Sequence, residues 1–154
     1  MTEKENSSGS LVLSLPLPPT VNQSYKSYPV GKRGTRTTCR MVLDDNAKAY
    51  KEMARMLAAT EWRRLEPFPV DGSTRFTLEM LMLLEKNSRD VDANIKLVMD
   101  GVMKGVKDAT GLKGMSDIRV FDAFLRKRLL REMPECEGME PQLIVSLSEW
   151  KPSR

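Results

Sequence analysis

Histidine is absent from this 154-residue chain, and its absence excludes several classes of enzyme site. A protein without histidine has no imidazole for general acid–base catalysis, for activating a serine or cysteine nucleophile, or for binding zinc. If the chain is an enzyme, its chemistry therefore depends on carboxylates, lysines or a metal ion bound by oxygen atoms.

Cysteines and long apolar segments are also scarce. The two cysteines, Cys39 and Cys136, lack the spacing of a metal site. We expect free thiols in a reducing cytoplasm, and a disulfide between them stays open as the alternative. No apolar run is long enough to span a bilayer and no signal peptide opens the chain, so we expect a cytoplasmic protein with no membrane partner.

Acidic residues are missing from the stretch between Ser7 and Leu43, although the net charge of the whole chain is only +4. Taken alone, a basic stretch is usually a solvated surface. Beside an acidic cluster, it suggests a polyanion bound outside and a cation bound within. The basic residues of this stretch are Lys26, Lys32, Arg33, Arg36 and Arg40, and a second basic group consists of Arg126, Lys127, Arg128 and Arg131.

The hydrophobic pattern predicts one domain, residues 10–150, after a disordered tail at residues 1–9. Alternating apolar residues indicate β-strands, and we expect the first strand to be central in the sheet. The predicted strands are Ser10–Leu15, Ser73–Leu84, Ile118–Leu130 and Gln142–Glu149.

Two helices are predicted, Asp45–Trp62 with Asp44 as its N-cap and Asp92–Asp108. Gly101 and Gly105 each cost the second helix about 1 kcal/mol relative to alanine, which close packing against a neighbour would justify. Residues 20–40 read as a long loop with at most a short hairpin near residues 31–34. The order β-α-β-α-β-β predicts an α/β two-layer sandwich, in which two helices pack on one mixed four-stranded sheet.

An acidic cluster stands where the second predicted strand leads into the second helix. Asp90, Asp92 and Asp100 surround Lys96 within eleven residues. Carboxylates placed so closely repel one another unless a cation lies among them, and oxygen ligands favour Mg²⁺ or Mn²⁺. The simpler interpretation is a helix cap, a surface charge and an ordinary i,i+4 pair between Lys96 and Asp100.

The chain resembles the RusA family of Holliday junction resolvases, which are endodeoxyribonucleases of phages and prophages. The resemblance spans residues 11–149. The matching features are Pro18-Pro19 with Asn22 after the first strand, a helix after a basic loop, Arg89-Asp90-Val91-Asp92, Lys96, Asp100, and Asp117-Ile118-Arg119-Val120. Two features differ from the family pattern: Ala93 stands where asparagine is usual, and the interval from Lys96 to Asp117 is longer.

The resemblance implies a catalytic set and its cofactor. Asp90, Asp92 and Asp117 would bind Mg²⁺, for which Mn²⁺ can substitute, and Lys96 would complete the site. The family forms homodimers that nick four-way junction DNA symmetrically. The residues then expected to bind DNA are Lys26, Lys32, Arg33, Arg36, Arg40 and Arg89.

Two other functions are compatible with the same residues. One is a junction-binding or single-strand DNA-binding protein whose acidic cluster does not cleave. The other is a small structural or interaction protein whose aspartates are caps and surface charges. Metal-dependent nicking separates the nuclease from both alternatives, and salt-sensitive DNA binding separates the two alternatives from each other.

Overall fold

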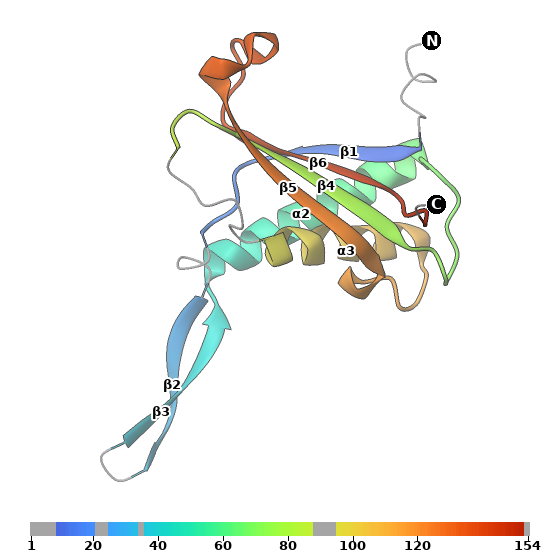
Figure 1. Ribbon diagram of the computed structural model, residues 1–154. Helices are drawn as coiled ribbons and strands as arrows, with labels where there is room; N and C mark the ends of the chain where they lie inside the picture. Colours follow the sequence, from blue (N-terminus) through green and yellow to red (C-terminus); the bar gives the residue numbers. More distant parts are fainter. Residues whose placement is uncertain (1–8, 21–24, 34–35, 88–94, 153–154) are drawn as a thin grey trace.

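The computed structural model describes residues 9–20, 25–33, 36–87 and 95–152, with only the backbone described for residues 25–42. These residues form one mixed four-stranded sheet, two helices that cover one of its faces, and a separate two-stranded hairpin (Figure 1). The predicted α/β two-layer sandwich is confirmed.

The sheet has the strand order β1-β6-β4-β5. The pairs β1–β6 and β6–β4 are antiparallel, whereas β4 and β5 are parallel and are connected through a helix. The predicted bounds of the first and last strands match the structure. The strands are β1 (Ser10–Leu15), β4 (Phe76–Leu84), β5 (Val120–Leu129) and β6 (Gln142–Glu149).

Three expectations about the strands were wrong. Strand β1 lies at an edge of the sheet and not at its centre, because it pairs only with β6. Its leucines are buried under α2 (Asp45–Leu65), while Val12 on the other face is 54% exposed, which is the alternation of a half-buried strand. The second predicted strand begins at Phe76 and not at Ser73, because Asp71 holds Ser73 and Thr74 in a hydrogen-bonded turn. The third predicted strand begins two residues late, because a 3₁₀ turn, η1 (Asp117–Arg119), precedes β5.

The helices are α2 and α3 (Ile95–Thr110). Asp44 caps α2 as predicted, since its Oδ2 accepts a hydrogen bond from the Asn46 backbone N–H at 3.0 Å. Helix α2 continues to Leu65 and ends at Glu66, whose φ of 41° is left-handed. The predicted start of the second helix, Asp92, lies outside the described residues.

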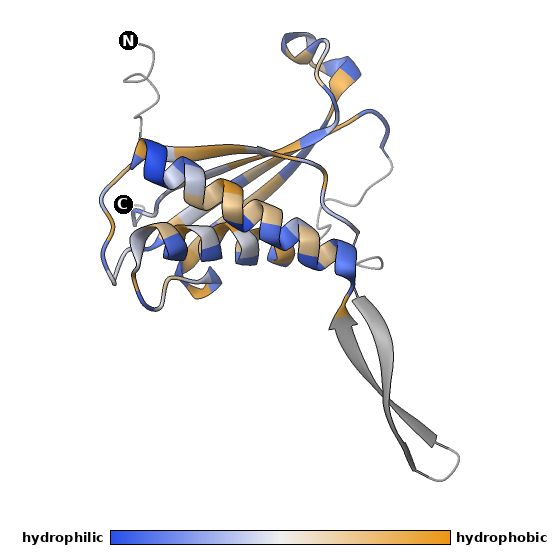
Figure 2. Ribbon diagram, turned by 180° about the vertical axis from the view of Figure 1, so that it is seen from behind, coloured by the Kyte–Doolittle hydropathy of each residue, from blue (hydrophilic) through white to orange (hydrophobic). Residues whose placement is uncertain are grey.

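The core lies between the helices and the inner face of the sheet. Figure 2, seen from the helix side, shows hydrophilic and hydrophobic residues alternating along both helices, as expected when each helix buries one face. Every second residue of β4 points into this core. The fully buried side chains include Leu11, Phe76, Leu78, Met82, Val98, Val102, Val106 and Leu147.

Helices α2 and α3 pack in the same direction and in unusually close contact. A Cβ atom added to Gly101 would lie 2.9 Å from the Lys51 carbonyl oxygen, and one added to Gly105 would overlap the Arg55 carbonyl oxygen. The order of these contacts shows that the helices run parallel. The two glycines of α3 are therefore explained by close approach of the helix backbones, as expected from the sequence.

A long hairpin stands where the sequence suggested a long loop with at most a short hairpin near residues 31–34. It consists of β2 (Tyr25–Arg33) and β3 (Arg36–Leu43), with a register shift between Pro29 and Gly31. The tyrosine, valine and threonine residues of these strands favour extended backbone, and this preference outweighs the loop-like content of glycine and serine. The hairpin projects away from the sandwich near the start of α2 (Figure 1).

The β5–β6 connection contains two short 3₁₀ turns, η2 (Leu130–Glu132) and η3 (Pro134–Cys136). Cys136 carries a free and buried thiol, which confirms the free-thiol expectation for this residue. Within the described part of the chain, no helix has the length and apolar content needed to cross a membrane.

The contact at Gly105 predicts a large effect of a single methyl group. Gly105→Ala should lower the free energy of unfolding by about 2 kcal/mol, because overpacking against the α2 backbone exceeds the gain in helix propensity. The measurement is urea unfolding followed by circular dichroism. Gly72→Ala is the control and should stay within about 0.5 kcal/mol, because no atom lies within 4 Å of the added Cβ. Equal stability of both variants would contradict the close helix contact.

Candidate functional site

The structure describes two of the four predicted catalytic residues, Lys96 and Asp117, and it brings them together. Asp90, Asp92 and the predicted DNA-binding residue Arg89 lie outside the described residues. Lys96 belongs to the first turn of α3, and Asp117 begins η1. The two are 21 positions apart in the sequence.

A direct hydrogen bond joins the pair. Lys96 Nζ donates to Asp117 Oδ2 at 2.8 Å, and a longer contact of 3.4 Å reaches Asp100 Oδ1 one helical turn on. The loop after α3 makes this possible, because Gly111 and Gly114 adopt positive φ angles of 70° and 77° and the chain doubles back along the helix. The segment between Lys96 and Asp117 is longer than in the family pattern, yet its path still brings Asp117 next to Lys96.

The pair is ionised at neutral pH. The hydrogen bond from Lys96 lowers the pKa of the Asp117 carboxyl, and the same bond raises the pKa of the Lys96 ammonium. The Lys96 side chain stays 69% exposed, whereas that of Asp117 is 29% exposed. A fixed positive charge is thus held at the surface beside a carboxylate.

Lys51, on the neighbouring helix α2, extends this site. Asp100 Oδ2 lies 3.9 Å from Lys51 Nζ on α2, so that Asp100 stands between Lys51 and Lys96. Burial lowers the pKa of Lys51, and the neighbouring Lys104 lowers it further. Lys51 was not predicted, and only the pairing of α2 with α3 across Gly101 places it here.

Asp117, the one predicted magnesium ligand among the described residues, has chemistry that suits Mg²⁺. Asp117 presents an ionised carboxylate, and hard oxygen atoms are the ligands that Mg²⁺ prefers. No group of three or more cysteine, aspartate or glutamate side chains forms a metal-binding cluster among the described residues. Asp90 and Asp92, the other two predicted ligands, are not among them, so Asp117 fits one position of the site.

The predicted DNA-binding residues of the basic stretch all lie on the hairpin. Lys26, Lys32 and Arg33 belong to β2, and Arg36 and Arg40 belong to β3. Arg33 and Arg36 occupy directly opposite register positions at the end of the ladder. Like charges at directly opposite positions in general destabilise a strand pair.

The second basic group lies on and after the edge strand β5. Arg126, Lys127 and Arg128 belong to β5, and Arg131 lies in η2. Lys127 Nζ donates a hydrogen bond of 2.6 Å to Asn87 Oδ1. Asn87 follows β4 and is the last residue described before α3. This group is separate from the hairpin.

The sequence matches none of the protein-family models, and it matches none of the curated proteins with which it was compared.

The hydrogen bond between Lys96 and Asp117 predicts a titration. Lys96→Met should raise the pKa of the Asp117 carboxyl, because the substitution removes the main cause of its depression. Carboxyl-carbon NMR during a pH titration measures this pKa. Lys107→Met, an exposed substitution in the last turn of α3, is the control and should leave it unchanged.

The same titration has a consequence for stability. Since the folded-state pKa of Asp117 is depressed, the pair stabilises the fold at neutral pH, and this contribution is lost as the pH falls through the folded-state value. Lys96→Met should therefore make stability less sensitive to acid. An Asp117 pKa that does not respond to Lys96→Met would contradict the pairing.

Proposed function

We propose that this protein is a Mg²⁺-dependent endodeoxyribonuclease that resolves four-way DNA junctions by paired symmetric nicks, in recombination and repair. The observation that carries the proposal is the contact between Lys96 and Asp117. A plain i,i+4 pair on α3 requires only Asp100 near Lys96. The resemblance to the RusA family requires Asp117 there as well, and Asp117 makes the shorter contact.

Each of these residues has a defined task in phosphodiester hydrolysis. Bound Mg²⁺ would supply a Lewis acid and an activated water. Asp117, together with Asp90 and Asp92, would hold that ion through carboxylate oxygens. Lys96 would place its ammonium against the scissile phosphate and stabilise the charge that develops there, and its raised pKa keeps it protonated.

Asp100 is suited to orient Lys96. Its two carboxylate oxygens face different lysines, Oδ1 toward Lys96 and Oδ2 toward Lys51. Because Asp100 is anchored on α3 and faces α2, it restricts the positions that the long Lys96 side chain can take. Correct orientation of a charged group is a major part of its catalytic effect.

The hairpin would hold the phosphate backbones of the junction arms. Its five basic residues lie on two paired strands, and phosphates beside Arg33 and Arg36 would relieve the repulsion between these opposite positions. Arg89 would add a contact next to the acidic cluster. Contacts to phosphates give affinity without reading the base sequence, as a structure-selective enzyme requires.

Paired nicks require two active sites, and one chain carries one acidic cluster. A homodimer with two-fold symmetry would present two clusters to the two-fold symmetric junction. The sheet face that the helices leave uncovered is the candidate interface, because Val12 and Phe124 are 54% and 47% exposed there.

The decisive experiment measures nicking of a synthetic four-way junction with and without Mg²⁺, beside a linear duplex. The wild-type protein should cut the junction only with the metal and should leave the duplex intact. Asp90→Asn and Asp117→Asn should each abolish cleavage, because each removes a ligand of the ion. Asp71→Asn is the matched control: Asp71 accepts hydrogen bonds within the α2–β4 turn, and cleavage should persist.

Binding and cleavage should respond in opposite directions to Asp90→Asn. In EDTA the carboxylates repel the scissile phosphate, so this variant should bind the junction at least as tightly as the wild type. Loss of both binding and cleavage would indicate a folding defect. Wild-type cleavage by Asp90→Asn would refute the nuclease, and salt-sensitive binding without any cleavage would favour the inactive junction-binding protein.

The hairpin makes a separate prediction about salt. Arg33→Ala combined with Arg36→Ala should weaken junction binding and reduce the slope of log affinity against log salt by about 0.9 for each phosphate that is no longer neutralised. Fluorescence anisotropy at several salt concentrations measures this slope. Arg64→Ala removes a positive charge that pairs with Glu61 on α2, and it should leave the slope unchanged. An unchanged slope in the double variant would place the hairpin away from DNA.

A further inference from the structure

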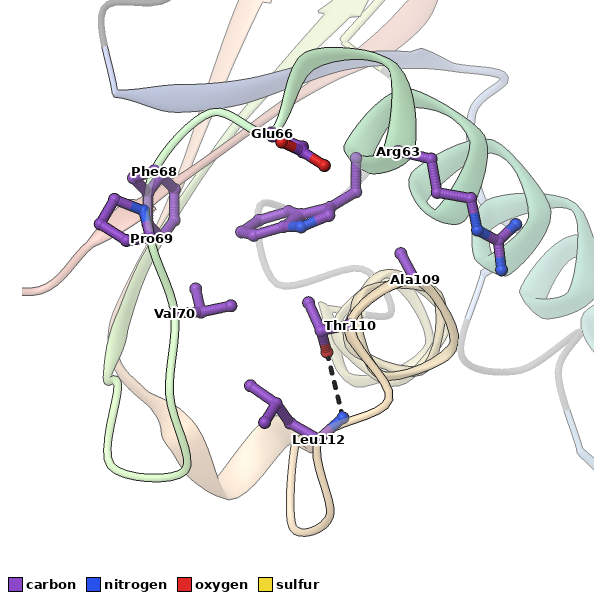
Figure 3. Close-up of a pocket in the computed structure, with 9 residues that line it drawn as sticks. Arg63, Glu66, Phe68, Pro69, Val70, Ala109, Thr110 and Leu112 are labelled. Atoms are coloured by element: carbon purple, nitrogen blue, oxygen red, sulfur yellow. Dashed lines mark hydrogen bonds between the residues drawn. The ribbon is translucent and has the colours of Figure 1, made fainter.

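A cavity of about 540 Å³ lies where α2 and α3 both end, within the usual size range of ligand pockets (Figure 3). Lys96 and Thr110 are fourteen positions apart on α3, which places the cavity about 21 Å along the helix from the candidate catalytic lysine. The cavity is thus distinct from the proposed nuclease site. Its lining comes from Trp62, Arg63, Glu66, Phe68, Pro69, Val70, Ala109, Thr110 and Leu112.

The two helix ends give this cavity an excess of hydrogen-bond acceptors. Because α2 and α3 run parallel, the carbonyl groups of both last turns and the negative ends of both helix dipoles meet here. The chain already uses some of these acceptors: the Glu66 and Gly111 backbone N–H groups donate to the carbonyl oxygens of Trp62 and Lys107. One of the donors is cationic, since the Arg63 guanidinium donates to the Asp108 carbonyl oxygen at 3.4 Å. The ends of these helices therefore favour a cation with several N–H donors.

Glu66 adds a full negative charge at this place. It follows directly after α2, is exposed, and lines the cavity. Figure 3 shows Glu66 beside the cavity, whereas the Arg63 side chain extends away from it. The Arg63 side chain is thus turned outward, and no ion pair or side-chain hydrogen bond among the described residues uses the Glu66 carboxylate.

Two aromatic residues complete the walls. The rings of Trp62 and Phe68 meet edge to face, with centroids 5.1 Å apart. Trp62 is only 5% exposed, and none of the hydrogen bonds among the described residues uses its indole N–H. This indole N–H can therefore donate to an acceptor on a ligand.

We propose that this cavity binds the side chain of an arginine presented by a peptide. The planar guanidinium stacks on aromatic rings and offers five donors to the Glu66 carboxylate and the helix-end carbonyls. The peptide carbonyl is the neutral acceptor for the Trp62 N–H. Free arginine is disfavoured, because its carboxylate would meet the negative charge of Glu66 and of both helix ends.

The experiment follows the Trp62 indole resonance of the full chain in ¹⁵N NMR. The chain has two tryptophans, so Trp150→Phe assigns the signals. N-acetyl-argininamide should shift the Trp62 resonance saturably at millimolar concentration. N-acetyl-citrullinamide, its neutral isostere, and free arginine should both bind more weakly. No saturable shift, or equal affinity for the arginine and citrulline amides, would overturn the proposal.

Two variants test the electrostatics with opposite signs. Glu66→Gln should weaken binding of N-acetyl-argininamide about two- to fivefold, because it removes one exposed charge pair. Arg63→Gln should strengthen binding by a similar factor, since it removes a neighbouring positive charge. The backbone amide spectrum of each variant reports whether the fold is kept. Weaker binding in Arg63→Gln, or unchanged binding in a folded Glu66→Gln, would refute a cation in the cavity.

Discussion

The close contact between α2 and α3 determines how the rest of the molecule is arranged. Gly101 and Gly105 have no side chain, so the two helix backbones approach more closely than any larger residue would allow. This contact fixes the relative register of the two parallel helices. It sets Lys51 opposite Asp100, pairs Arg55 with Asp108, and gathers both helix C-termini around one cavity.

Regular periodicity made most of the fold predictable from the sequence. The bounds of β1 and β6 could be predicted to the residue, because apolar residues alternate cleanly and turn residues follow each strand. The position of β1 within the sheet could not be predicted, since an edge strand and a central strand can show the same alternation of apolar residues. The length of the hairpin was underestimated because its glycines, serines and threonines are also common in loops, and strand pairing is a property of two segments together.

The site residues also fall into two groups, those that the sequence could predict and those that it could not. The family resemblance named Lys96 and Asp117, and the structure places their side chains 2.8 Å apart. Lys51 carries no local signal, because its contact with Asp100 depends on the register of two helices that are far apart in the sequence. The cavity beyond Trp62 was equally invisible, since it exists only where two helix ends and a connecting loop meet. Contacts within an element can be predicted from spacing, whereas a contact between elements requires a family resemblance, as for Lys96 and Asp117, or the packing itself.

The projecting hairpin also creates a hazard that its own sequence reduces. A ribbon of only two strands has two free edges, and each edge carries backbone groups that can pair with a strand of another molecule. Pro29 lacks a backbone N–H, the register shift beside it interrupts the ladder, and five lysines and arginines repel a second ribbon. The charge that would hold a polyanion thus also opposes edge-to-edge aggregation, and neutralising these residues for any purpose would remove that protection.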